Sequence, residues 1–420
     1  MSARRIVITG MGAVTPLGNS VAETWKGLSE GKSGVGRITI FNADSFPTKI
    51  AGEVKNFDFS RWPGSTWGRN SLFALEAGRQ AMEDAGLSGG APDSSRIGIY
   101  FGAGDGGINF PEYASILCDS MEKESSSINA GRYYENRVSR QDPKQLLEEE
   151  PFQVVNHLSE NFKIHGVISN CLTACAASSQ AIGEAAEIIK KGQADFMMTG
   201  GSHSMIHPLG VAGFNLLTAL STRNDEPQKA SRPFDKTRDG FVLSEGAGVL
   251  ILEELEHAKK RGAKIYAELI GYGGTADAFR LTDPHPEGRG AIRAMRLAME
   301  NAKVRPEDIH YINAHGTSTQ LNDQIETHSV KEVFKEHSKK IPMSSIKSML
   351  GHMIAAAGVT EIIASVLTIR EGLIPATINY ENKDEACDLD YVPNKARAQK
   401  VDTVLSNSFG FGGQNIALIV

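Results

Sequence analysis

The segment from residue 164 to residue 200 constrains the fold of this 420-residue chain more than any other stretch. Residues 167–172 form a short β-prone run, and residues 173–179 are all small. From Ala181 to Ile189 apolar residues recur at helical spacing, and a second β-prone run follows. The order strand, tight turn, helix, strand predicts an α/β unit in which Cys175 lies where a strand passes into a helix.

The position of Cys175 has chemical consequences. The free N–H groups and partial positive charge of a helix start favour a thiolate. Small neighbours let a carbonyl group approach closely, and the backbone N–H of Cys175 can then act as an oxyanion donor. A buried structural cysteine is the other interpretation, and this segment alone leaves both open.

Composition narrows the class of protein. The net charge of −6 argues against a nucleic-acid-binding protein. No apolar run approaches the length of a membrane span, and the N-terminus lacks the apolar stretch of a signal peptide. We expect a cytoplasmic protein with free thiols and no metal site, because none of its cysteines has metal-ligand spacing: Cys118, Cys171, Cys175 and Cys387.

The order of elements along the chain suggests a duplicated architecture. Strands alternate with helices throughout, and at about residue 264 a strand followed by glycines occurs again, as at the N-terminus. A strand, a turn of small residues and a helix occur around Cys175 and again around His352. We therefore expect two similar halves, residues 1–262 and 263–420. Within the first half, a charged segment at about 105–165 is expected to form solvated helices and loops, or to cap a pocket.

Two histidines in the second half could act with Cys175. His315 is expected at the end of a strand, before a hydroxyl-rich loop, and His352 at the start of an alanine-rich helix. Either one alone is typical of a hydrogen-bonded structural histidine. Together with Cys175 they offer a thiol nucleophile and two imidazoles that can donate hydrogen bonds or move protons.

Four motifs together resemble those of the β-ketoacyl-[acyl-carrier-protein] synthases, the elongating type II condensing enzymes of the thiolase superfamily. They are residues 173–175 (TAC), 313–319 (NAHGTST), 347–352 (KSMLGH) and 407–413 (NSFGFGG). The resemblance implies the thiolase fold, with duplicated halves in five α-β-α-β-α layers. It also implies a homodimer, with the nucleophile in residues 1–262 and both histidines in residues 263–420.

The resemblance further implies a decarboxylative Claisen condensation. Cys175 would take an acyl group as a thioester, and His315 and His352 would promote loss of CO2 from malonyl-[acyl-carrier-protein]. The product would be a 3-oxoacyl-[acyl-carrier-protein] in fatty-acid elongation. No cofactor is expected, because the substrates travel on the phosphopantetheine arm of acyl carrier protein.

The same resemblance assigns supporting roles. The N–H groups of Cys175 and Phe411 would hold the oxyanion, and neutral imidazole N–H groups would stabilise an enolate without a metal. Lys347, paired with Glu326 in the family, would keep the histidines oriented and uncharged. The remaining expected contacts are the phosphopantetheine-binding Thr317 and Thr319, the gating aromatics Phe409 and Phe411, and the pocket-lining Phe214.

Departures from the family pattern leave alternatives open. Segment 105–165 is longer and more charged than usual, so the acyl chain length stays open. Residues 60–70 replace a basic run that meets the acidic carrier protein, and only Arg61 and Arg69 remain there. A dedicated ketosynthase of a specialised polyketide or unusual-lipid pathway is one alternative. A non-catalytic partner subunit that shapes chain length is another, although such partners typically lack the nucleophile.

Overall fold

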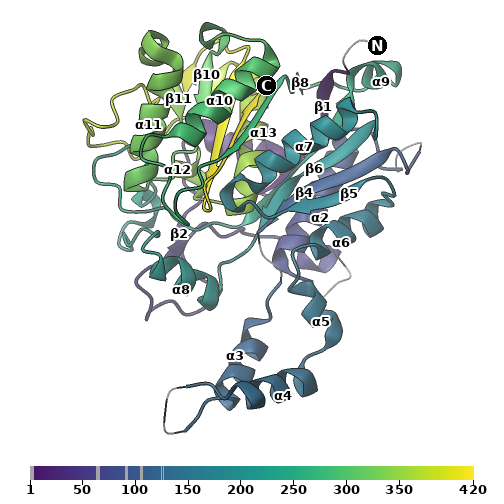
Figure 1. Ribbon diagram of the computed structural model, residues 1–420, viewed down its shortest axis with the longest axis vertical. Helices are drawn as coiled ribbons and strands as arrows, with labels where there is room; N and C mark the ends of the chain where they lie inside the picture. Colours follow the sequence, from purple (N-terminus) through teal and green to yellow (C-terminus); the bar gives the residue numbers. More distant parts are fainter. Residues whose placement is uncertain (1–3, 63–66, 90–92, 105–106, 124, 126) are drawn as a thin grey trace.

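The computed structural model describes residues 4–62, 67–89, 93–104, 107–123, 125 and 127–420. Two mixed β-sheets form the body of this part of the chain (Figure 1). The first sheet has the spatial order β5 (Ile168–Cys171), β4 (Ile97–Ala103), β6 (Phe196–His203), β7 (Gly246–Glu254), β1 (Ile6–Val14) and β8 (Ala267–Glu268). The second has the order β11 (Met343–Ser344), β10 (Tyr311–Asn313), β14 (Val404–Gly410), β15 (Gln414–Ile419) and β9 (Gly271–Ala276).

The two sheets share one topology. In each, three neighbouring parallel strands are followed by two antiparallel ones: β5-β4-β6 then β7 and β1, and β11-β10-β14 then β15 and β9. In each sheet the strand that comes first in the sequence, β1 or β9, is the fifth in this spatial order. The predicted duplication is therefore confirmed. Strand β8, beyond residue 262, adds to the edge of the first sheet beside β1.

Helices and sheets alternate in five layers (Figure 1). Helices α7 (Ala177–Lys190) and α13 (Ala357–Glu371) pack against each other between the sheets. The outer face of the first sheet is covered by α2 (Arg69–Asp84) and α6 (Gln153–Phe162), and that of the second by α10 (Arg289–Ala302) and α11 (Gln320–Phe334). Apolar side chains of both sheets and both central helices form one buried cluster, which supplies the main hydrophobic stabilisation.

The two central helices approach closely because small residues face each other. A Cβ atom at Gly358 of α13 would lie 1.9 Å from Ser179 Oγ of α7, so only glycine fits. The hydroxyl of Ser178 accepts a hydrogen bond from the Val359 N–H at 3.0 Å. This contact brings the two helix starts together.

Both central helices begin in the same unusual way. A 3-10 turn precedes each one: η2 (Ala174–Ala176) before α7 and η6 (Ile354–Ala356) before α13. The first residue of each turn is left-handed, with φ of 47° at Ala174 and 43° at Ile354. Non-glycine residues rarely adopt this conformation, so the surrounding fold must hold both turns in place. Cys175 therefore lies in the turn that leads into α7, where the sequence predicted it.

The charged segment forms an arm that extends away from the body (Figure 1). It comprises α3 (Phe110–Asp119), α4 (Ala130–Arg140) and α5 (Pro143–Glu148), after which α6 returns to the first sheet. The arginines of α4 pair within the arm, Arg137 with Glu149 and Arg140 with Asp119. The expected solvated helices are thus confirmed, although residues 105–106, 124 and 126 lie outside the described residues.

The described chain also contains shorter α-helices and two short strand pairs. They are the helices α1 (Val21–Ser29), α8 (Pro208–Leu216), α9 (Leu255–Lys260) and α12 (Lys347–Leu350), and the strand pairs β2–β3 (Gly36–Arg37, Ile50–Ala51) and β12–β13 (Leu373–Ile374, Arg397–Ala398). Among the described residues, no helix combines the length and the apolar character needed to cross a membrane.

Candidate active site

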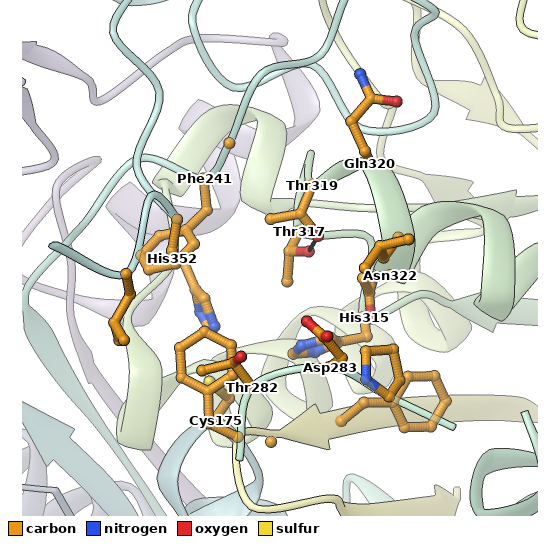
Figure 2. Close-up of a pocket in the computed structure, with 18 of the residues that line it drawn as sticks. Cys175, Phe241, Thr282, Asp283, His315, Thr317, Thr319, Gln320, Asn322 and His352 are labelled. Atoms are coloured by element: carbon orange, nitrogen blue, oxygen red, sulfur yellow. Dashed lines mark hydrogen bonds between the residues drawn. The ribbon is translucent and has the colours of Figure 1, made fainter. Parts of the chain in front are cut away.

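A cavity of about 270 Å³ brings Cys175, His315 and His352 together (Figure 2). Cys175 comes from the first half, and both histidines come from the second. All three are buried, whereas Leu217 and Leu321 on the same cavity are 49% and 51% exposed. The cavity therefore runs from a buried reactive end to an open mouth.

Burial controls the Cys175 thiol. It raises the pKa of Cys175 to about 11, although hydrogen bonds from the backbone N–H groups of Phe411 and Cys175 act in the opposite direction. The sequence-based expectation that the helix start favours a thiolate is thus wrong for the unliganded site, because desolvation of the charged sulfur outweighs it. The two N–H groups near the sulfur are the pair expected to hold an oxyanion.

His352 presents one defined donor to the cavity. Its Nδ1 accepts a hydrogen bond from the Ile354 N–H at 3.2 Å, so the neutral ring carries its proton on Nε2. That nitrogen is buried and has no hydrogen-bond partner within the described part of the chain. Burial, followed by the nearby Lys347 and His203, holds the pKa of His352 well below its usual value. A neutral imidazole N–H is therefore available to a ligand.

His315 faces His352 across the cavity. The ring centroids are 5.5 Å apart and the planes are nearly perpendicular, at 83°. Burial, then Lys347 and His352, hold the pKa of His315 well below its usual value. Two neutral imidazoles thus converge beside the thiol, an arrangement that can donate hydrogen bonds without adding a buried charge.

Lys347 does not pair with Glu326. Its ammonium group forms an ion pair with Glu361 of α13 and donates to the His315 carbonyl oxygen at 2.7 Å. Glu326 of α11 instead accepts from the backbone N–H groups of His315 and Gly316, at 2.9 and 2.8 Å. Burial raises the pKa of Glu326 to about 7. The expected lysine–glutamate pair exists, but its acid is Glu361, and Glu326 fixes the backbone of the histidine loop.

The hydroxyl-rich loop after His315 lies along the cavity. Thr317 and Thr319 both line it, with their hydroxyl oxygens 2.9 Å apart (Figure 2). Arg238, which is fully buried, donates to the backbone carbonyls of Thr319 and Gln320 at 3.0 Å each. Its guanidinium therefore holds the loop in position for contacts with a ligand.

The aromatic residues occupy different places around the site. Phe409 and Phe411 line the cavity, and the Phe409 ring lies 5.6 Å from that of His315. Phe214 is not among the residues that line it. Instead Phe214 packs against Phe241, at 5.5 Å, and Phe241 contacts His352 edge-on at 5.2 Å. Phe214 thus belongs to the apolar cluster around Cys175 and reaches the cavity through Phe241.

Sequence reasoning missed Glu361 and Phe241. Glu361 is the one charged residue in the first turns of α13, and a charge in a buried helix indicates a paired group. That signal was available. Phe241 follows a turn-rich loop and carries no comparable signal, since its role depends on which strands the fold brings together.

The two arginines of residues 60–70, Arg61 and Arg69, both form ion pairs within the protein. Arg69 forms an ion pair with the buried Glu245, and Arg61 with Glu76. Neither is a free surface cation. Residues 63–66 between them lie outside the described residues.

Comparison with known proteins agrees with this geometry. Residues 3–258 match the Beta-ketoacyl synthase N-terminal domain and residues 266–381 match the C-terminal domain. The chain belongs to the β-ketoacyl synthase family. A 3-oxoacyl-[acyl-carrier-protein] synthase 2 from Coxiella burnetii is 46% identical, over 100% of this chain and 99% of the relative. A protein of the same name from Synechocystis is 44% identical over 100% and 98%.

Solved β-ketoacyl synthase structures share the thiolase fold of this chain. A β-ketoacyl synthase from Burkholderia phymatum has a TM-score of 0.88 and 36% identity, covering 99% of this chain and 98% of that one. A type II PKS ketosynthase bound to a hexaketide, in complex with its acyl-carrier protein, has a TM-score of 0.87 and 34% identity, covering 100% and 99%. These likenesses extend over the whole chain, so the family assignment includes both halves of the site.

Proposed function

We propose that this chain condenses an acyl thioester with malonyl-[acyl-carrier-protein], giving 3-oxoacyl-[acyl-carrier-protein] and CO2 in fatty-acid elongation. The observation that carries the proposal is one cavity that holds the Cys175 thiol and the neutral imidazoles of His315 and His352. Relatives named 3-oxoacyl-[acyl-carrier-protein] synthase 2 support it over the full length of the chain.

In the first step Cys175 takes the acyl group. Its sulfur attacks the acyl thioester carbonyl, the bond to the carrier thiol breaks, and the proton of Cys175 ends on that departing thiol. The backbone N–H groups of Cys175 and Phe411 stabilise the oxyanion of the tetrahedral intermediate. Because the resting thiol is protonated, this proton transfer belongs to the acylation step.

In the second step the histidines act on the malonyl thioester. The Nε2–H of His352 and an imidazole N–H of His315 donate to its carbonyl oxygen, and CO2 departs as the electron pair of the broken bond forms an enolate. The enolate carbon then attacks the acyl–Cys175 carbonyl and expels the Cys175 sulfur as a thiolate, which takes a proton from solvent to restore the resting thiol. Thr317 and Thr319 hold the phosphopantetheine arm. The positive charge of Lys347 disfavours protonation of both histidines.

A second copy of this chain is the proposed structural partner. Strand β5 forms one edge of the first sheet and leads directly to Cys175. It and its flanks expose apolar side chains, of which Leu172 is 57% exposed, with Val167 and Ile168 beside it. An exposed apolar edge strand is suited to pairing with another strand. We therefore propose a homodimer joined through β5.

The four cysteines are free, which is compatible with the proposed cytoplasmic, reducing setting.

A purified system tests the proposed reaction. Acyl carrier proteins loaded with saturated chains of graded length should be elongated by two carbons in the presence of malonyl-[acyl-carrier-protein]. The His352→Ala variant should lose malonyl decarboxylation. Product formation by that variant at the wild-type rate would contradict the mechanism.

A specialised polyketide or unusual-lipid ketosynthase is the second candidate function. The structural likeness to the hexaketide-bound ketosynthase and to the ishigamide ketosynthase/chain length factor, at 34% identity each, supports it. The same assay distinguishes the two, since a polyketide enzyme would elongate 3-oxoacyl or unsaturated chains faster than saturated ones. A non-catalytic chain-length subunit is disfavoured, because this chain keeps Cys175 and both histidines in one cavity.

A further inference from the structure

The electrostatics of the cavity mouth are unexpected for the proposed substrates. Malonyl groups and phosphopantetheine arms are both anionic. Yet the described residues that line the cavity include Asp239, Asp277 and Asp283, and neither lysine nor arginine. A site for anions therefore needs a cation supplied from just outside this lining.

Asp239 and Asp277 are occupied by the protein itself. Asp239 accepts from Ser221 Oγ at 2.7 Å and from the Thr222 N–H at 3.1 Å, and its Oδ1 lies 3.7 Å from Nε of Arg223, whose Nη2 donates to the Thr237 carbonyl. Asp277 accepts from the His285 N–H and from Asn415 Nδ2, both at 3.0 Å. These two carboxylates order the backbone around the cavity.

Asp283 differs from both because its hydrogen-bond donor is a guanidinium. Its side chain lies among those that face the cavity (Figure 2). It forms an ion pair with the guanidinium of Arg280, with Nη1 and Oδ2 3.1 Å apart. Asp283 thus connects the cavity with a cation beside its mouth.

The position of Arg280 is defined, although its side chain is 66% exposed. Its guanidinium packs over the Phe279 ring, at 5.3 Å from the centroid. The loop that carries it is anchored on both sides, since Gly412 N–H donates to the Leu281 carbonyl and Asp277 N–H donates to the Gly413 carbonyl. An arginine stacked on one face and open at its edge is suited to binding a phosphate.

We propose that Arg280 is a positioning residue that binds the phosphodiester of the incoming phosphopantetheine arm, and that Asp283 holds its guanidinium until the arm arrives. This inference rests on the proposed function, because it concerns the same thioester substrates. An exposed ion pair contributes little free energy, so a phosphate can displace Asp283 from Arg280 at small cost. Coenzyme A carries the same pantetheine 4′-phosphate as part of a diphosphate, so both sources of the group should engage this arginine.

The test compares octanoyl thioesters of pantetheine and of 4′-phosphopantetheine, which differ only in the phosphate. The rate of acylation of Cys175 is followed by intact-protein mass spectrometry. We expect the wild type to prefer the phosphorylated thioester by about 5- to 10-fold in kcat/KM, and Arg280→Ala to reduce this preference to about twofold or less. Asp283→Asn, which removes the competing carboxylate, should raise the preference above that of the wild type.

Arg305→Ala is the matched control. Arg305 also pairs with an aspartate three residues later, Asp308, and is exposed, but it immediately precedes η4 (Pro306–Asp308) and does not line the cavity. This control should keep the wild-type preference. A full preference in Arg280→Ala, or a fall in Asp283→Asn, would overturn the inference.

Octanoyl-coenzyme A and octanoyl-[acyl-carrier-protein] separate the sources of the phosphate. An equal loss with both in Arg280→Ala supports contact with the shared pantetheine 4′-phosphate, whereas a loss confined to the carrier protein would mean a contact with the protein surface and refute the assignment. If none of these thioesters acylates Cys175, the proposed function fails instead, whatever the phosphate preference.

Discussion

The buried pair between Lys347 and Glu361 gives a sharp test of how the site is held together. Their side chains are only 3% and 2% exposed. In Lys347→Met the Glu361 carboxylate would lose its counter-ion, and the His315 carbonyl would lose a donor. Breaking a buried pair in this way costs about 3–5 kcal/mol, so at pH 8 we expect the free energy of unfolding to fall by about that amount. Urea unfolding followed by tryptophan fluorescence measures it.

The double variant Lys347→Met/Glu361→Leu should recover most of this loss, because no buried charge remains. The pH dependence has a definite sign. Burial raises the pKa of Glu361 above its ordinary value of 4.5, and loss of the lysine, which lowers it, would raise it further. Protonation of Glu361 therefore stabilises the fold fully below about pH 4.5, and this contribution is lost as the pH rises through the folded pKa. The deficit of the single variant should accordingly shrink on acidification.

Activity provides a readout that is independent of stability. After burial, Lys347 is the largest cause that holds the pKa values of His315 and His352 down. Both variants lack Lys347, so their histidines should become protonated more easily. The rate of malonyl decarboxylation should therefore fall on acidification at a higher pH in both variants than in the wild type. The reasoning is refuted if the single variant is as stable as the wild type at pH 8, or if the double variant is no more stable than the single one.

Three further outcomes are expected. Cys175→Gln should abolish condensation and leave malonyl decarboxylation, measured as CO2 release; continued condensation would rule out the covalent route. Gly358→Ala should destabilise the protein by about 1–3 kcal/mol in thermal or urea unfolding, because its Cβ would meet Ser179 Oγ. Adding Ser179→Ala to this variant should restore part of the lost stability, and no recovery would mean that the strain arises elsewhere. Leu172→Asp should shift the light-scattering mass of the proposed dimer to that of a monomer, and an unchanged mass would exclude the β5 seam.

The local pattern of the sequence was sufficient to predict the central helical layer. Apolar spacing from Ala181 to Ile189 predicted the interior of α7, and the small residues before it predicted a tight turn at Cys175. The similar run around His352 predicted the duplication, because local elements and their order do not depend on distant contacts. The motifs then pointed to the residues that the structure brings into one cavity.

Properties that depend on three-dimensional surroundings were not predictable in this way. The partner of Lys347 could not be chosen, since both Glu326 and Glu361 are buried beside the histidine loop and only backbone positions decide between them. The state of Cys175 was misjudged because a helix start and deep burial act in opposite directions on its pKa. The placement of the α3–α5 arm also follows from tertiary contacts, which charge density alone does not specify.

The matched turns at the two central helices carry a chemical implication. Counting from the left-handed residue that opens each turn, Ala355 holds in the second half the position that Cys175 holds in the first. Ala355 does not line the cavity that holds Cys175 and packs instead with Cys171, Ala177 and Ala181. The duplicated scaffold is therefore chemically directional, because of the two matched turns only the one before α7 presents a nucleophile to the cavity, while both histidines come from the other half.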